Sequence, residues 1–453
     1  MGRESPQLFI RVENIETTHP PPTLRSEDSL TTYKEMANTM ASLPGQFLSG
    51  KRIFVAGAGI GSLAFVSALE QLWPRDLASK HPEVTVFERE TRQDSIQKDN
   101  YMLDITGGSP DEGLFALQQL GLLDSIRPYS TLNSGLINVW SDKWKFLADI
   151  APKAYGNLPA ATMRITRENL KRILLENSEK GNTVFQWQST CTSAERLQNG
   201  QIRVTIQDVE AGTIHTEDCD LLIAADGSNS KIRETFRPFD SKVVYSGVTQ
   251  IGGISRLTQG LPHPVEEDYG LQMSSGEGVC CIYTPFDAET IGWAVSKPGP
   301  ARDAHPGPFT QEEFAALKNE ALKTASMFDE PFKTIVEATD PSTAFIRPAY
   351  EKQPFQHDAR MRGVVFIGDA NRVVNPFVLV GANLALKDGW DMAEQLCYNT
   401  SLDSAVAGYD RLSIPRVEHA IKFSHERVRF GHSTGLMWKI YKYGMAAQRK
   451  IGK

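Results

Sequence analysis

A glycine-rich turn stands near the start of the chain, at the point where a predicted strand gives way to a predicted helix. Ile53–Ala56 is expected as a short buried strand, and Leu63–Leu72 as a helix with apolar residues at helical spacing. Between them lie Gly57, Gly59, Gly61 and Ser62. The amides of such a turn and the helix dipole can receive a pyrophosphate that bulkier side chains would exclude. Because Ser62 replaces a further glycine, an ordinary strand-to-helix turn remains an alternative.

An acidic residue ends the second predicted strand. Glu88 directly follows Val84–Phe87, and Arg89 comes next. An acid at this point of a β-α-β unit can accept hydrogen bonds from the ribose hydroxyls of an adenine dinucleotide. The spacing from Gly57 exceeds the roughly 20 residues usual for this motif, and we expect the excess in a surface insertion over Trp73–Glu83. The alternative is a solvated acid beside Arg89.

Two further buried strands each deliver an acid at their carboxyl end. Asp226 follows the strand predicted over Asp220–Ala225, and Asp369 follows Val364–Ile367. Pro376 then precedes a helix that begins near Gly381, Ala382 and Asn383. An acid at a strand end can bond a ribityl hydroxyl, and a helix N-terminus can stabilise negative charge at flavin N1 and O2.

In this order the four motifs resemble the class A flavin monooxygenases of the p-hydroxybenzoate hydroxylase fold. Met102–Ser109 and Arg164–Leu170 resemble segments of the tetracycline-inactivating branch, and the resemblance runs from about Lys51 to His432. It implies that Asp104 and Arg167 contact the flavin, Glu88 and Arg89 the ADP half, and Asp369 the ribityl and pyrophosphate region. The residues predicted to bind the cofactor are Gly57, Gly59, Gly61, Ser62, Glu88, Arg89, Asp104, Arg167, Asp226, Asp369, Pro376, Gly381, Ala382 and Asn383.

The resemblance implies bound FAD, with NADPH as a transient co-substrate because no second glycine-rich turn is present. NADPH would reduce the flavin, oxygen would add at C4a, and the hydroperoxide would deliver one oxygen atom to an organic substrate. By family analogy this is a hydroxylation in secondary metabolism. The sequence names no catalytic base, since His357 and His432 are candidates by residue type alone.

Two departures from the family pattern lie beside the predicted flavin. Leu379 and Val380 replace the glycine and glutamine of the usual Pro-Phe-Ala-Gly-Gln-Gly-Ala-Asn, and Asn371-Arg372 replaces the Ala-His that usually follows Gly-Asp-Ala. The altered loop supports one alternative, an FAD-dependent oxidoreductase or cyclase that does not oxygenate. Two others are a flavin halogenase, whose Trp-x-Trp-x-Ile-Pro signature is missing, and a binding protein with a vestigial nucleotide fold.

Composition narrows the class of protein and its partners. The 453 residues carry a formal net charge of -7 with pI about 5.8, which argues against a nucleic-acid footprint and favours a small-molecule substrate with O2. Five cysteines without a CxxC pair favour neither zinc nor a disulfide framework. No secretory signal or membrane-spanning apolar stretch is evident. We expect a cytoplasmic protein with no obligate membrane association; a monomer would suffice, although the oligomeric state is open.

The order of elements predicts an α/β fold: a Rossmann-like FAD-binding domain, an inserted β-sheet substrate domain and a C-terminal bridging helix. Helices are expected over Asn169–Lys180, Ala382–Tyr398 and Arg416–Gln448. We assign residues 1–49 to an N-terminal extension, 50–126, 155–240 and 345–400 to the FAD-binding domain, 127–154 and 241–344 to the substrate domain, and 401–453 to a C-terminal helical segment.

Two segments keep alternative interpretations. Tyr245, Met273, Tyr283, Phe286 and Trp293 of the inserted sheet fit an aromatic or polycyclic ligand, and fit ordinary core equally well. The C-terminal segment around Trp438–Tyr443, with basic residues nearby, is expected to bridge the two domains rather than to form an interfacial basic helix.

Overall fold

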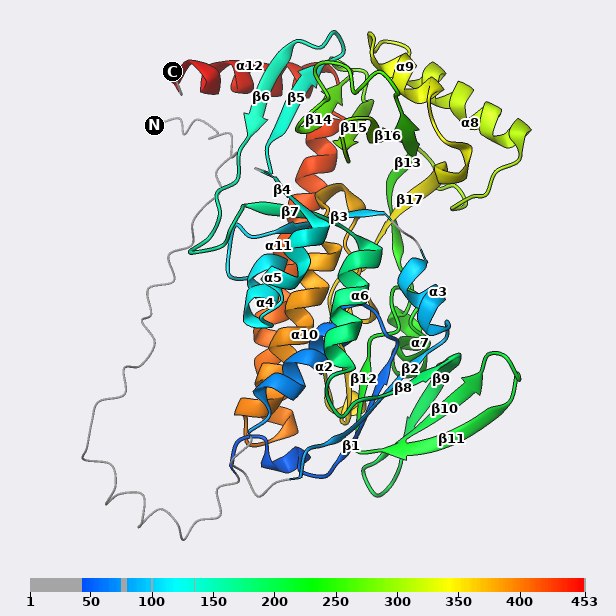
Figure 1. Cartoon of the computed structure of the whole chain (residues 1–453), viewed down its shortest axis with the longest axis vertical. Coiled ribbons are helices and arrows are strands. Elements are labelled where there is room, and N and C mark those ends of the chain that lie inside the picture. Colours follow the sequence, from blue (N-terminus) through cyan, green and yellow to red (C-terminus); the bar gives the residue numbers. More distant parts are fainter. Residues whose placement is uncertain (1–42, 75–79, 99–100, 134, 452–453) are drawn as a thin grey trace, which may run out of the picture.

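A five-stranded parallel sheet carries the predicted nucleotide motifs. The structure is a computed structural model that describes residues 43–74, 80–98, 101–133 and 135–451 (Figure 1). The sheet has the order β18-β12-β1-β2-β8, and every neighbouring pair is parallel. Its strands are β1 (Arg52–Ala56), β2 (Glu83–Glu88), β8 (Val184–Trp187), β12 (Leu221–Ala224) and β18 (Val364–Phe366). Since β12 and β18 are buried throughout, both faces of the sheet must be covered.

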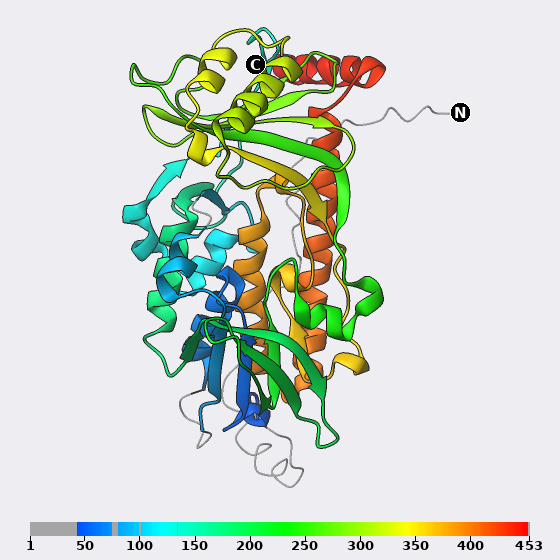
Figure 2. The same cartoon turned by 90° about the vertical axis from the view of Figure 1, so that its right-hand side faces the viewer.

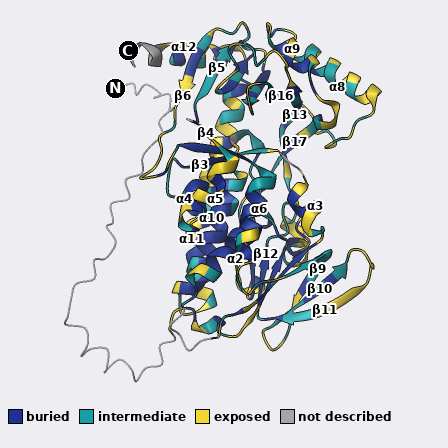
Figure 3. Cartoon of the chain, viewed as in Figure 1, coloured by how far each residue is buried: buried dark blue, intermediate teal, exposed yellow. Residues whose placement is uncertain are grey.

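Helices cover one face of this sheet and a small antiparallel sheet covers the other. α2 (Ile60–Leu72) packs between α6 (Arg167–Ser178) and α10 (Gly381–Tyr398), and α2 and α10 are largely buried (Figure 3). A Cβ on Gly389 would lie 2.3 Å from the Gly61 carbonyl oxygen, so glycine lets the two helices cross this closely. The opposite face packs on β9 (Ser189–Arg196), β10 (Ile202–Asp208), β11 (Ile214–Cys219) and α7 (Lys231–Phe236).

A seven-stranded sheet forms the other end of the molecule (Figures 1 and 2). Its order is β17-β13-β16-β15-β14-β5-β6. The strands are β5 (Ile137–Ser141), β6 (Phe146–Ile150), β13 (Val244–Arg256), β14 (Tyr269–Met273), β15 (Cys280–Pro285), β16 (Thr290–Pro298) and β17 (Phe345–Glu351). α8 (Gln311–Thr324) and α9 (Phe332–Glu337) pack on one face through a core that includes Tyr283 and Trp293.

Two strands lie in a different sheet from the one predicted. β17 pairs with β13 in the seven-stranded sheet, although residues from 345 onward were assigned to the FAD-binding domain. β4 (Ser130–Asn133) was placed in the substrate domain, but it joins the three-stranded sheet β3-β7-β4 with β3 (Met102–Thr106) and β7 (Thr162–Thr166). Both strands lie where the chain passes between the two parts, and pairing partners distant in sequence decide which sheet they join.

Two helices end the chain, where a single one had been predicted over Arg416–Gln448. α11 (Leu402–Gly431) starts after the N-cap Ser401, contains Pro415 within the helix, and runs from the five-stranded sheet to the seven-stranded one. α12 (Gly435–Ile451) follows and packs on β6. The predicted start at Arg416 was too late, because α11 already runs through Pro415. The predicted fold class is confirmed, with α11 as the bridging helix, whereas Trp438 lies on α12 and does not bridge.

The remaining elements are short. They are α3 (Arg92–Gln97), α4 (Gly113–Gln119), α5 (Leu123–Ile126), and the 3-10 turns Gln46–Leu48, Arg127–Tyr129, Pro238–Asp240, Pro341–Thr343, Ala359–Met361, Gly368–Ala370 and Pro376–Val378. Among the described helices, none has the length and apolar character needed to cross a bilayer.

Candidate cofactor site

Two glycines of the turn after β1 have different reasons to be glycine. Gly57 has φ of 92°, and a Cβ there would lie 2.8 Å from the Ala225 carbonyl oxygen, so the fold itself requires glycine. Gly59 has φ of -79°, which any residue adopts. The nearest described atom to a Cβ on Gly59 is Ser62 Oγ at 4.0 Å. Protein packing therefore leaves room for a side chain at Gly59, and this is the room that the predicted pyrophosphate would need.

The first turn of α2 offers backbone amides to such a ligand. Gly59 is the N-cap residue, and no described side chain caps this end of the helix. The first intrahelical bond runs from Leu63 N to Gly59 O at 3.0 Å, so the amides of Ile60, Gly61 and Ser62 lack intrahelical acceptors. Ser62 Oγ donates to Gly59 O at 2.9 Å. The Ser62 hydroxyl therefore bonds within the turn. Only the Ser62 amide can take part in the cofactor binding that was predicted for this residue.

Glu88, at the end of β2, stabilises the glycine turn after β1 through hydrogen bonds. Its carboxylate accepts from Ala58 N at 2.8 Å and from Glu90 N at 3.2 Å, and the residue is 9% exposed. The alternative of a solvated acid is therefore wrong. Arg89 is exposed and pairs with Glu90 at 3.2 Å. The predicted insertion after α2 falls partly on residues 75–79, outside the described residues, and its first member, Trp73, is buried in the core.

Lys171 is a buried cation near Glu88 that the sequence did not single out. Its Nζ donates to Ser95 Oγ at 2.6 Å, and only 3% of the residue is exposed. Burial lowers the pKa of Lys171 to about 8, although the nearby Glu88 carboxylate opposes the shift. Lys171 lies at an ordinary position of α6, so nothing in the neighbouring sequence indicates that this lysine is buried near Glu88.

Asp226 lies beside the glycine turn at the carboxyl end of β12. Its Oδ2 accepts from Lys231 N at 2.8 Å and Ile232 N at 3.2 Å, which caps α7. Burial raises the pKa of Asp226, against the hydrogen bonds that lower it. Among the described residues, its buried Oδ1 has no hydrogen-bond partner. We call the glycine turn Gly57–Ser62, together with Glu88 and Asp226 beside it, the glycine cradle. A buried acceptor without a partner in this cradle fits a ligand hydroxyl or amide.

Asp369 stands on the 3-10 turn after β18, and two buried arginines fix it. Arg233 donates to the carbonyl oxygens of Asp369 at 3.1 Å and Ala370 at 2.9 Å. Arg372 Nη1 bonds Asp369 Oδ1 at 3.1 Å, while 45% of the Asp369 side chain is exposed. The carboxylate is therefore oriented and still accessible. Arg372, the departure from the family histidine, acts here as a support for the predicted ribityl-binding acid.

Arg372 also connects this turn to the helices through a buried charge network. Its Nη2 bonds Asp388 Oδ2 at 2.9 Å, and Asp388 further accepts from Gly368 N, Ser413 Oγ and Arg416 Nη2 at 3.2, 3.0 and 3.0 Å. Asp388 is fully buried and fully paired, as a buried carboxylate must be. The network joins the Asp369 turn, α10 and the bridging helix α11 into one unit.

The N-terminus of α10 lies close to that of α2, because the helices cross at Gly61 and Ala385. No described side chain caps α10, whose N-cap is Val380, so the amides of Gly381, Ala382 and Asn383 lack intrahelical acceptors. The Asn383 side chain itself is satisfied. It accepts from Thr106 N at 2.8 Å and Gly113 N at 3.2 Å and donates to Asp104 O at 2.8 Å.

The loop before α10 carries a strained residue. Leu379, which follows the turn that contains Pro376, has φ of 55° and is 43% exposed. The left-handed conformation costs a non-glycine residue about 1 kcal/mol, so the glycine expected by family resemblance would fit this backbone better. The chain keeps an exposed leucine there in spite of that cost.

Asp104 and Arg167, predicted to contact the flavin, both engage protein groups. Asp104 Oδ1 lies 3.4 Å from Nε of Arg164, and both residues are buried. Arg164 also donates to Pro285 O at 2.7 Å, and its guanidinium lies 3.7 Å above the Tyr269 ring, which ties β7 to the seven-stranded sheet. Arg167 Nη1 donates to Lys98 O at 2.7 Å. Burial raises the pKa of Asp104 to about 6, against the lowering effect of Arg164.

The two candidate histidines have separate roles in the structure. His357 Nδ1 pairs with Asp410 at 2.7 Å, and its Nε2 accepts from Phe366 N at 2.8 Å, which makes it a support for β18. His432 Nε2 lies 2.9 Å from Ser296 Oγ and 3.4 Å from Cys280 Sγ, and its ring packs on Phe377. His432 thus joins α11 to the seven-stranded sheet beside the loop at Phe377.

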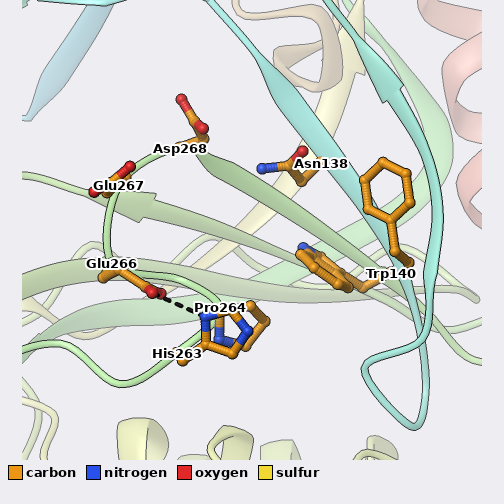
Figure 4. A pocket seen from close by; sticks show the side chains of 8 residues that line it. Asn138, Trp140, His263, Pro264, Glu266, Glu267 and Asp268 are labelled. Atoms are coloured by element: carbon orange, nitrogen blue, oxygen red, sulfur yellow. Dashed lines mark hydrogen bonds and ion pairs between the residues drawn. The ribbon is translucent and has the colours of Figure 1, made fainter.

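The aromatic residues of the inserted sheet are mainly core. Tyr283 and Trp293 pack under α8 and α9. A hollow of about 230 Å³ lies on the sheet between β5 and the loop 263–268, and Figure 4 shows Asn138 and Trp140 facing His263, Glu266 and Glu267. It contains none of the predicted cofactor residues, and its carboxylates would repel a pyrophosphate. The hollow is separate from the glycine cradle.

The glycine turn, the two uncapped helix N-termini and the acids at three strand ends lie together, and this is the place that the sequence predicts for FAD. The FAD binding domain family model matches residues 111–424. Monooxygenase cfoF of Aspergillus candidus is 36% identical over 394 residues, covering 86% of this chain and 93% of cfoF. Monooxygenase penA of Penicillium thymicola is 25% identical, covering 84% and 95%. The chain belongs to the FAD binding domain family of FAD-dependent monooxygenases.

Solved structures share the fold. HpxO of Klebsiella pneumoniae, complexed with FAD and uric acid, superposes with TM-score 0.69 at 19% identity, covering 90% of this chain and 96% of HpxO. A salicylate hydroxylase substrate complex gives TM-score 0.66 at 16% identity, with 89% and 95% covered. At these identities the likeness establishes the arrangement of the two sheets and the bridging helix, and it leaves substrates open.

Proposed function

We propose that the chain is an NADPH-dependent class A monooxygenase that inserts one oxygen atom of O2 into an aromatic or polycyclic substrate, in secondary metabolism. The observation that carries the cofactor assignment is the open position at Gly59 in front of the uncapped α2. The fungal relatives named monooxygenases support the reaction class. The uric acid in the HpxO structure supports a ring-shaped substrate. The nearer kinship to the tetracycline-inactivating branch stays a prediction.

The cofactor would be held by groups from both helix termini. The amides of Ile60 and Gly61 would bind the pyrophosphate, Asp369 the ribityl chain, and the amides at the start of α10 the pyrimidine edge of the flavin. Glu88 and Asp226 would accept bonds from the ADP half. Bound FAD supplies the electron transfer and the activation of oxygen. The protein supplies orientation, and the buried network behind Asp369 fixes that orientation.

The substrate would bind against the face of the seven-stranded sheet opposite α8 and α9. Strand alternation places Ile251, Tyr283 and Val295 in the core beneath those helices, so Gln250, Ile282 and Ala294 point the other way. That face is turned toward the FAD-binding part, since His432 and Arg164 contact it. Its mixed apolar and amide surface suits a flat ring system that carries a polar substituent.

The test is a single-turnover experiment on the FAD-saturated protein. Reduction by NADPH and by NADH is followed without oxygen, and the reduced protein is then mixed with isotopically labelled dioxygen and a panel of aromatic and polycyclic compounds. We expect faster reduction by NADPH and one labelled oxygen atom in a product. Substrate turnover that consumes no oxygen would instead favour the non-oxygenating oxidoreductase or cyclase.

A further inference from the structure

α12 is apolar on two opposite faces. One face packs on β5 and β6 through Trp438, which is 6% exposed, and Met445, which is 1% exposed. The other face carries Leu436, Ile440 and Tyr443, exposed by 72%, 39% and 75%. These three recur at the i, i+4, i+7 spacing of a single helical stripe. A helix with apolar residues on both sides belongs between two apolar layers, and the described part of the chain supplies only one of them.

The charge of α12 differs from that of the rest of the chain. The helix contains four basic residues and no acidic one, in a chain with net charge -7. Lys439 and Lys442 are exposed and lie along one flank of the stripe. Long lysine stems allow the ammonium groups to reach past neighbouring apolar atoms. The exposed apolar stripe is therefore bordered by positive charge, which is the pattern of a helix that lies in a membrane interface.

The position of α12 suits a flat partner. The helix lies at the end of the molecule beyond β6 and projects past the seven-stranded sheet, as Figures 1 and 2 show. A protruding helix has no groove of its own for a peptide. A second copy of the chain would bring two basic helices together, which like charges oppose. An anionic bilayer offers both the negative surface and the apolar layer that the exposed face lacks.

We propose that α12 is a peripheral docking helix for anionic lipid bilayers, with Leu436, Ile440 and Tyr443 entering the interface and Lys439 and Lys442 contacting the headgroups. This goes beyond the proposed oxygenation and does not depend on it. Docking at this end brings the seven-stranded sheet to the lipid surface, where apolar ring compounds accumulate. The attachment is reversible, because one short stripe buries far less apolar surface than a spanning helix.

Vesicle flotation of the full-length, FAD-saturated protein tests this. Vesicles of phosphatidylcholine alone are compared with vesicles that also contain phosphatidylserine, at low and high salt. We expect binding to the anionic vesicles that salt weakens. The double variant K439Q/K442Q should bind them about 30-fold more weakly, and L436S/Y443S at least about tenfold more weakly.

Matched controls separate docking from general charge and apolar exposure. K323Q/K333Q removes two exposed lysines from α8 and α9 at the same end of the molecule, and I214S removes an apolar side chain that is 65% exposed on β11. Both should bind as the unmodified protein does, and all variants should keep their FAD content and melting temperature. Failure of the unmodified protein to float with anionic vesicles, or equal losses in the controls, overturns the proposal. A dimer by light scattering that L436S/Y443S dissociates, without vesicle binding, would assign the face to a second copy.

Discussion

The substitution Gly59→Ser tests whether glycine at this position is required for folding or for binding FAD. Serine adopts the extended backbone of Gly59 without strain, and its Cβ would have Ser62 Oγ at 4.0 Å as its nearest described neighbour. At the N-cap its hydroxyl would accept from the amide of Gly61 or Ser62. A serine hydroxyl bonded to the Gly61 amide would therefore occupy one of the two amides that we assign to the pyrophosphate.

The expected effects on stability and on affinity have opposite signs. Serine is a slightly better N-cap than glycine, so the free energy of unfolding without FAD should rise by about 0.3 kcal/mol. One lost hydrogen bond to a charged group is worth about 1.5–3 kcal/mol, so the Kd for FAD should rise at least about tenfold. Gly57→Ser is the matched comparison. Its φ of 92° and the contact of 2.8 Å with Ala225 O predict a loss of stability of about 2 kcal/mol or more.

Two measurements on each variant distinguish an effect on folding from an effect on FAD binding. Urea denaturation of the FAD-free protein gives the free energy of unfolding, and quenching of flavin fluorescence on titration gives the Kd. A Gly59→Ser variant that binds FAD as tightly as the parent would refute the placement of the pyrophosphate at α2. If that variant instead unfolds without FAD, glycine at this position serves the fold after all.

Three further substitutions test the surroundings of the site. Arg372→Met should lower the free energy of unfolding by about 2 kcal/mol, because buried Asp388 loses one of its two arginine partners and the Asp369 carboxylate loses its bond to Arg372; a loss below about 1 kcal/mol in urea denaturation would contradict this. Asp104 has a pKa of about 6 in the folded protein and about 3.9 when unfolded, so the folded state binds the proton more tightly between these values and stability falls as pH rises. Between about pH 5 and about pH 7 the FAD-free parent should lose about 1 kcal/mol more than FAD-free Asp104→Asn, and parallel pH profiles would exclude the raised pKa. At Leu379, with φ of 55°, Val should destabilise by about 1 kcal/mol while Gly should not; equal melting temperatures of all three proteins would disprove the strain.

The parts of the site that the sequence predicts are local in the chain. The glycine turn, Glu88, Asp226 and Asp369 each follow a short apolar strand, and a strand, a turn and a helix N-terminus are set by neighbouring residues. Their convergence follows from parallel strand pairing, since carboxyl ends of parallel strands meet at one edge. These residues therefore lie together in the structure, while their contacts with FAD remain predictions.

The parts that were missed depend on contacts between distant segments. Arg372 meets Asp388 and, through it, Arg416, and Arg164 meets Tyr269 across the two sheets. No periodicity marks such pairs, because each residue lies at an ordinary position of its own helix, strand or loop. α11 likewise begins earlier than predicted: it packs on α10 and continues through Pro415, a residue that disfavours helices.

The most direct test of the account is the visible spectrum of the purified protein mixed with FAD, followed by NADPH without oxygen and then by air. We expect the two visible bands of a bound oxidised flavin, loss of the longer-wavelength band with NADPH, and its return in air. A protein that leaves FAD free in solution would contradict the assignment of the cradle between α2 and α10. Flavin that binds but is not reduced by NADPH or NADH would contradict the proposed catalytic cycle.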